Sequence, residues 1–124
     1  VDMLFIDNLS AISREGKNDN IEMKNIIQKI SNLATKLNTA IVLVHHYKKR
    51  QAKESSRWRD LHESAGSGEI IKFSPQILQI SRNREPASEE ESAEFFVKEA
   101  KNRVAGKTEE TIIYFSKGDF YNIF

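Results

Sequence analysis

The sequence of 124 residues contains no cysteine. This excludes a disulfide framework and a thiolate metal site, and it fits a reducing cytoplasm. No apolar run approaches the roughly 20 residues that a membrane-spanning helix needs, and no signal-peptide pattern is present. The net charge is only +1, which by itself indicates no class of partner. We expect a cytoplasmic protein without a membrane partner.

The length suits one small domain, and the balance of apolar and charged residues predicts a packed core rather than disorder. The chain opens at Val1, without an initiator methionine, inside a stretch that is typical of a buried strand. We therefore expect residues 1–124 to form a single incomplete domain whose upstream part is missing.

Two short apolar runs, each ending in polar residues, predict the centre of the fold. The first is VDMLFID, Val1–Asp7, which is followed by Asn8, and the second is AIVLVHHYKK, Ala40–Lys49. Such runs, rich in Val and Ile, are typical of strands buried on both faces of a parallel sheet. Because ligands of open α/β folds bind at the carboxyl edge of the sheet, we expect Asp7 and His46 to meet there.

Between the two runs, a polar connection over 9–20 leads into a helix that begins near Asp19. Apolar side chains recur at helical spacing up to Leu37, and Asn38 is suited to end the helix. A strand, a helix and a strand in this order form a βαβ unit, which predicts that the two strands are parallel.

Further along, Gln76–Ser81 is typical of a third strand and Arg82–Ser92 of a loop. Three more strands are separated by turns at Gly106 and Gly118; they are Phe95–Ala100, Thr111–Phe115 and Phe120–Phe124. Connections this short impose antiparallel pairing. The sequence therefore predicts an α/β fold with a mixed sheet, in which parallel βαβ strands are followed by C-terminal antiparallel hairpins.

Asp7 is a candidate magnesium ligand, because α/β proteins that hydrolyse nucleotides hold Mg²⁺ with a carboxylate at a strand end. The alternative is that Asp7 caps the next turn through a hydrogen bond of its side chain.

His45 and His46 point to opposite faces of a strand, which disfavours a metal site formed by both. One histidine at the carboxyl edge could donate a hydrogen bond to a phosphate oxygen, or it could be an ordinary satisfied polar residue.

A basic segment follows the second strand, with six cations against two carboxylates over positions 48–60. Cations for phosphates and an aromatic ring for stacking are the composition of a contact with single-stranded nucleic acid. The alternative is a solvated loop. The candidate residues are Lys48, Lys49, Arg50, Lys53, Arg57, Trp58 and Arg59.

Lys101 and Arg103 follow a predicted strand and, at this spacing, share a face from which both can reach one anion. Arginine suits the stabilisation of charge on a transferring phosphoryl group, although an exposed pair on an edge strand would also guard against aggregation.

The segment AGKT, 105–108, looks like the end of a P-loop. However, Lys101 replaces the first glycine of that motif and a strand-like segment follows, so we interpret it as a hairpin turn.

In this order the segments resemble the second half of a RecA-like ATPase core, as in the DnaB-type and RepA-type hexameric replicative helicases. LFIDNLSAI resembles the Walker B strand, with Asp7 in the place of the Mg²⁺-associated aspartate, and IVLVHHYKK resembles the strand that ends in the γ-phosphate sensor, here His46. DLHESAGSGEI resembles the Gly-Ser-Gly segment that follows a DNA-binding loop. KNRVAGKTEETIIYF resembles the closing hairpins, where Lys101 and Arg103 match the pair that reaches the ATP site of the neighbouring subunit.

The resemblance implies a fragment of an ATP-dependent DNA helicase of the replicative, hexameric type, which couples ATP hydrolysis to translocation on single-stranded DNA. It implies ATP and Mg²⁺ as cofactors, held through Asp7 and Asn8, and catalytic roles for His46, Lys101 and Arg103. It also implies neighbouring subunits of a homo-oligomer, a hexamer in this family, as partners. Because the 124 residues contain no P-loop, we expect the chain alone to be inactive. A non-catalytic RecA-like module that binds nucleic acid or a partner stays open as an alternative, as does a metal-dependent hydrolase.

Overall fold

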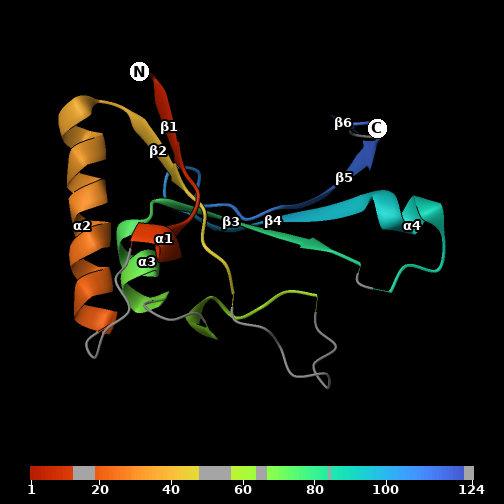
Figure 1. Ribbon diagram of the computed structural model, residues 1–124, viewed down its shortest axis with the longest axis horizontal. Helices are drawn as coiled ribbons and strands as arrows, with labels where there is room; N and C mark the ends of the chain where they lie inside the picture. The colour runs from red at the N-terminus through yellow and green to blue at the C-terminus, as the bar shows by residue number, and fades with distance from the viewer. Residues whose placement is uncertain (13–18, 48–56, 64–66, 84, 122–124) are drawn as a thin grey trace. The chain divides into compact units, whose positions relative to one another are not determined.

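The computed structural model describes residues 1–12, 19–47, 57–63, 67–83 and 85–121. Figure 1 shows the helices and strands along the chain. In order, they are β1 (Met3–Ile6), α1 (Leu9–Ile12), α2 (Asp19–Leu37), β2 (Ala40–Leu43), the 3₁₀ turn η1 (Leu61–Glu63), α3 (Ser67–Phe73), β3 (Gln76–Arg82), α4 (Glu89–Ala93), β4 (Glu94–Asn102), β5 (Glu110–Ser116) and β6 (Asp119–Tyr121).

Contacts divide the described residues into two compact units. Unit 1 takes its residues from Val1–Ala52 and Asp60–Ser74, and unit 2 takes them from Lys53–Arg59 and Pro75–Phe124. The strands are divided in the same way, since β1 and β2 form one sheet and β3, β4, β5 and β6 form another. The predicted α/β fold, with parallel strands first and antiparallel hairpins last, is confirmed, and the two kinds of pairing belong to separate sheets.

In unit 1, β1 and β2 pair in parallel, from Met3 opposite Ala40 to Ile6 opposite Leu43. The helix α2 connects the two strands and lies beside them (Figure 1). The predicted βαβ unit is therefore confirmed.

The end of α2 explains the short step from helix to strand. The amide of Asn38 donates to the carbonyl of Thr35 (3.3 Å), and the amide of Thr39 donates to the carbonyl of Ala34 (3.1 Å). Asn38 has a φ of 49°, the left-handed conformation that ends many helices and that asparagine tolerates. The predicted helix end at Asn38 is confirmed.

The core of unit 1 is small and lies on one face of the β1–β2 pair. Leu9 is fully buried, and partly buried side chains, including Leu43, pack against the cluster that it forms with Met23 and Ile27. Alternate side chains of a strand point away from such a core, and accordingly Met3 and Phe5 remain 51% and 66% exposed. The expectation that these strands are buried on both faces is therefore wrong.

Two segments expected to be loops contain short helices. The connection over 9–20 begins with α1, whose first residue is the fully buried Leu9. The segment 82–92 contains the start of α4, which is capped because the hydroxyl of Ser88 accepts a hydrogen bond from the amide of Glu91 (3.1 Å). The carboxylate of Glu91 in turn accepts the amide of Ala87 (2.9 Å).

Unit 2 is built on an antiparallel sheet in the order β3-β4-β5-β6. The predicted turns at Gly106 and Gly118 are confirmed, with φ values of 68° and 92° that favour glycine. Among the described helices, none is long and apolar enough to cross a membrane. The strands predicted from sequence correspond to β3, β4, β5 and the described part of the last one, β6.

Candidate functional site

Asp7 and His46 lie side by side just beyond the ends of β1 and β2. The strand pairing continues past both ends, since the amide of Val44 donates to the carbonyl of Ile6 and the amide of Leu9 donates to the carbonyl of Val44, each at 2.9 Å. Nε2 of His46 is 3.9 Å from Oδ1 of Asp7, and the two side chains are 66% and 71% exposed. The predicted meeting of Asp7 and His46 at this edge is confirmed, whereas their roles stay predictions.

The arrangement suits a magnesium ion that is shared with a nucleotide better than a metal ion bound by protein alone. Mg²⁺ keeps several waters and takes one or two carboxylates together with phosphate oxygens. Asp7 offers one exposed carboxylate, and Asn8 follows it half-buried in the turn. No cluster of three or more His, Asp or Glu side chains able to hold a metal occurs in the part of the chain that the structure describes.

His45 differs sharply from its neighbour His46. Both ring nitrogens of His45 are buried, and neither has a hydrogen-bond partner within the described residues. Burial lowers the pKa of His45, and the adjacent charge of His46 lowers it further, so the buried imidazole is held neutral. In the extended chain His45 lies on the face that carries Leu43, which packs on the core. This placement disfavours a metal site formed by both histidines.

The predicted nucleic-acid segment is described only at its C-terminal end. Lys48, Lys49, Arg50 and Lys53 lie outside the described residues. Arg57, Trp58 and Arg59 belong to unit 2, where the guanidinium carbon of Arg57 is 3.5 Å from the ring centre of Phe96. The ammonium group of Lys98 is 5.7 Å from the ring centre of Trp58.

Lys101 and Arg103 stand at the end of β4 and in the turn that follows, again in unit 2. The amide of Arg103 donates to the carbonyl of Pro75 (2.9 Å), which fixes the turn against the start of β3. Burial lowers the pKa of Lys101, and the nearby charge of Arg103 lowers it further. Arg103 thus lies beyond the strand, whereas the prediction placed both cations on one strand face, and both residues belong to a different unit from Asp7 and His46.

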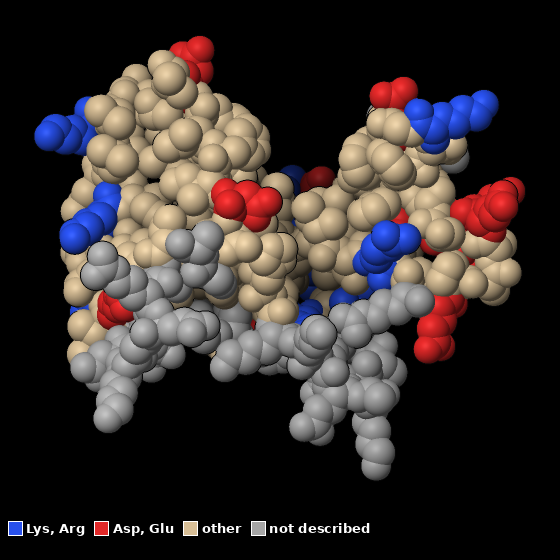
Figure 2. Space-filling model, in the orientation of Figure 1, with Lys and Arg blue, Asp and Glu red and all other residues tan. Residues whose placement is uncertain are grey.

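The visible surface shows no large region of one charge within the described residues. In Figure 2, positive and negative side chains are interspersed, and the acidic ones gather around α4, whose first turn carries Glu89, Glu90 and Glu91.

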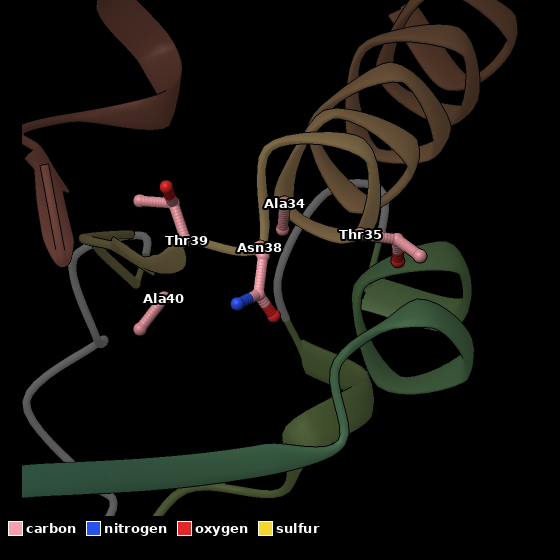
Figure 3. A pocket seen from close by; sticks show the side chains of 5 residues that line it. All are labelled: Ala34, Thr35, Asn38, Thr39 and Ala40. Carbon is pink, nitrogen blue, oxygen red and sulfur yellow. The ribbon is translucent and has the colours of Figure 1, made fainter.

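An open depression of about 310 Å³ lies where α2 turns into β2. Figure 3 shows the side chains of Asn38, Thr39 and Ala40 at this turn and those of Ala34 and Thr35 on the last turns of α2. None of these five lining residues is titratable, and none belongs to the predicted site. The depression offers no group for the chemistry considered above.

Comparisons with known proteins support the fold that these elements form. The family model described as an AAA domain matches residues 1–52, the stretch that carries Asp7 and His46. No curated protein sequence matches the chain significantly. Among solved structures, a DnaB-like replicative helicase, reported with its interactions with primase, superposes with a TM-score of 0.79 at 19% identity. A second solved structure, an ATPase domain, superposes with a TM-score of 0.76 at 21% identity.

The chain spans less than half the length of either solved structure. Each match covers 98% of this chain, but only 30% of the DnaB-like helicase and 44% of the chain of the second structure. At these identities the matches show the fold alone. The chain therefore has the fold of part of these two structures, and the predicted resemblance in fold to a DnaB-type protein with a RecA-like core is confirmed.

Proposed function

We propose that this chain is part of an ATP-dependent DNA helicase of the replicative, hexameric type, with residues 1–124 forming a portion of one RecA-like ATPase domain in a cytoplasmic protein. The observation that carries the proposal is the pairing of Asp7 with His46 at the ends of two parallel strands. These residues lie in the stretch that matches the AAA domain, and nearly the whole chain shares its fold with helicase ATPase domains.

In this proposal Asp7, Asn8 and His46 bind the Mg²⁺–ATP complex at this edge, and His46 contacts ATP only while the terminal phosphate is present. Bound Mg²⁺ neutralises charge on the phosphates of ATP. Asp7 holds the ion, directly or through water, with an exposed carboxylate. His46 lies beside it with Nε2 close to the same space, from which an imidazole N–H can donate to a terminal phosphate oxygen.

Lys101 and Arg103 act on a neighbouring subunit of a homo-oligomer, which is a hexamer. Their charges lie close together, and Arg103 is exposed at the turn after β4. Clustered cations of this kind stabilise negative charge on a transferring phosphoryl group. Because the sequence has no P-loop, the chain alone neither binds ATP tightly nor hydrolyses it.

The basic segment binds single-stranded DNA, and its salt dependence provides the test. The affinity of the chain for a fluorescent oligothymidylate, measured by anisotropy at rising NaCl, should fall linearly on a logarithmic plot. Each phosphate contact contributes a slope of about −0.7, so the slope reaches about −4 if all six cations bind phosphates. Arg57→Ala should reduce the steepness by about 0.7.

Lys107 provides a matched control, since it is an exposed cation of unit 2 outside the basic segment. Lys107→Ala should leave the slope unchanged. An affinity for the oligonucleotide that does not respond to salt would remove the basic segment from the DNA contact, and with it the translocation part of the proposal.

A second candidate is a non-catalytic RecA-like module that binds nucleic acid or a partner. The genomic sequence upstream separates the two. A GxxxxGK[ST] motif after a strand, roughly 80 to 100 residues before Val1, would support the helicase. A stop codon or an unrelated domain at that place would support the module.

A further inference from the structure

Residues 57–59, which we call the strap, are fastened to the β3–β4 sheet by their backbone. The hydroxyl of Ser81 donates to the carbonyl of Arg57 (3.3 Å). The side-chain amide of Gln79 donates to the carbonyl of Arg59 (2.8 Å). Both donors belong to β3 and, two positions apart on a strand, lie on the same face of the sheet.

Side chains of the strap lie against the same face of the sheet. Gln79 is opposite Lys98 and Ser81 is opposite Phe96 in the antiparallel register, so these four residues form one continuous patch. The guanidinium of Arg57 lies 3.5 Å from the ring centre of Phe96, and the ammonium of Lys98 lies 5.7 Å from the ring centre of Trp58. Both distances are within the range of cation–π attraction.

The side chains beneath the strap are buried, so their contacts with the strap are part of the packed structure. Phe96 and Gln79 are each only 6% exposed. Burying an amide is unfavourable unless it makes hydrogen bonds, and a buried position in a sheet would otherwise favour an apolar residue. The bond from Gln79 to the strap therefore explains why an amide occupies this position.

The docked strap still presents groups that can bind nucleic acid. Arg57 stays exposed and Trp58 stays half-buried. A guanidinium that stacks on a ring through its face keeps its N–H edge available for a phosphate. The attachment orders the strap before any ligand arrives, and order that exists in advance lowers the entropic cost of binding.

We propose that Gln79 and Phe96 are positioning residues that hold the strap on unit 2 and thereby order Arg57, Trp58 and Arg59 for single-stranded nucleic acid. The identity of the ligand, single-stranded nucleic acid, rests on the proposed function, whereas the attachment of the strap to the sheet is independent of that function. The proposal gives β3 and β4 a role in nucleic-acid binding that the sequence motifs do not indicate. It also places the strap on the strand that ends with Lys101 and Asn102.

The attachment is tested first without nucleic acid. Trp58 is the only tryptophan in the sequence, so its fluorescence reports on the strap alone. Gln79→Met keeps the side chain's length and removes the donor to Arg59, so the emission of Trp58 should shift to the red and its quenching by acrylamide should increase. Gln76→Met is the matched control, because Gln76 lies on the same strand but donates to Glu99 (2.6 Å); it should leave both signals unchanged.

The second measurement separates positioning from direct contact. In the oligothymidylate titration, Gln79→Met should weaken binding about 3- to 10-fold, because one or two side chains must then be ordered on binding. The salt slope should remain that of the unsubstituted chain, because every cation is still present. A lower slope, or an unchanged affinity, would overturn the positioning role.

Substitutions of Phe96 guard against a loss of folding. Phe96→Tyr keeps the ring under Arg57 and should retain the affinity, whereas Phe96→Leu should weaken it, with circular dichroism confirming that both variants are folded. Ser81→Ala is a milder change that should raise the quenching of Trp58 without unfolding the sheet. If the unsubstituted chain binds no oligonucleotide, the proposed function fails and the role of the strap in binding fails with it. The quenching data still decide whether Gln79 holds the strap.

Discussion

If Asp7 and His46 serve a binding site rather than the fold, replacing them should change the free energy of unfolding only slightly. Nε2 of His46 and Oδ1 of Asp7 are 3.9 Å apart, and both side chains are about two-thirds exposed or more. Exposed pairs of this kind contribute about 0.2–1 kcal/mol, and the contribution falls as salt screens it. We therefore expect Asp7→Asn and His46→Gln each to change the free energy of unfolding by less than about 1 kcal/mol.

Leu9 provides the opposite case two residues along the chain from Asp7. Its side chain is fully buried, and its amide holds the turn to the carbonyl of Val44 (2.9 Å). Truncating a buried leucine to alanine costs about 2–5 kcal/mol, out of a total stability of about 5–15 kcal/mol for a typical domain. Leu9→Ala should therefore cause a large shift of the urea midpoint, and it shows that the assay detects changes in unit 1.

The assay is urea unfolding followed by circular dichroism, applied to the two single variants and to the double variant. The coupling energy from this cycle should stay below about 1 kcal/mol and should decrease in high salt. A loss of about 2 kcal/mol or more on Asp7→Asn alone would refute the reasoning, because it exceeds what an exposed pair contributes. It would mean that the carboxylate caps the turn before α1, which is the structural alternative to a magnesium ligand.

Three further predictions concern His45, whose ring nitrogens are buried, and Asn38, whose φ is positive. His45→Leu should raise the free energy of unfolding by about 1–3 kcal/mol, because it removes two buried nitrogens without partners among the described residues; a decrease in urea unfolding would contradict this. Because burial lowers the pKa of His45 from its ordinary value of 6.5, the unfolded chain takes up the proton first. Stability should then fall as the pH drops below about 6.5, and His45→Leu should remove that part of the decline. Asn38→Ala should cost about 1–2 kcal/mol, because φ is 49° there, whereas Asn32→Ala in the middle of α2 should be neutral or stabilising in thermal unfolding.

The parts of the fold that could be predicted are those encoded by local periodicity. The spacing of apolar side chains in α2 and the short apolar runs between turns in β4 and β5 are visible within a short window of sequence. Turn residues add equally local information, as the positive φ of Asn38 and Gly118 shows. The meeting of Asp7 with His46 followed from one further rule, that strands of a βαβ unit are parallel.

The parts that could not be predicted depend on partners far away in the sequence. The expectation of strands buried on both faces failed at Phe5, because hydrophobicity alone does not reveal which face a core covers. The strap was recognised only as a basic segment, since nothing in residues 57–59 indicates that Gln79 lies beneath Arg59. By contrast, a local signal for α4 was present: Ser88 and Glu91 have the spacing of a capping box.

The division of the candidate residues between the two units has a mechanical consequence for a helicase. Asp7 and His46 belong to unit 1, whereas the strap and the Lys101–Arg103 pair belong to unit 2. In the proposed helicase, a strap that binds single-stranded DNA while it is fastened to β3 and β4 would place the DNA contact on the sheet whose strand β4 ends next to Lys101 and Arg103. Under the proposed function, a shift of this one sheet would move the DNA contact and the Lys101–Arg103 pair together.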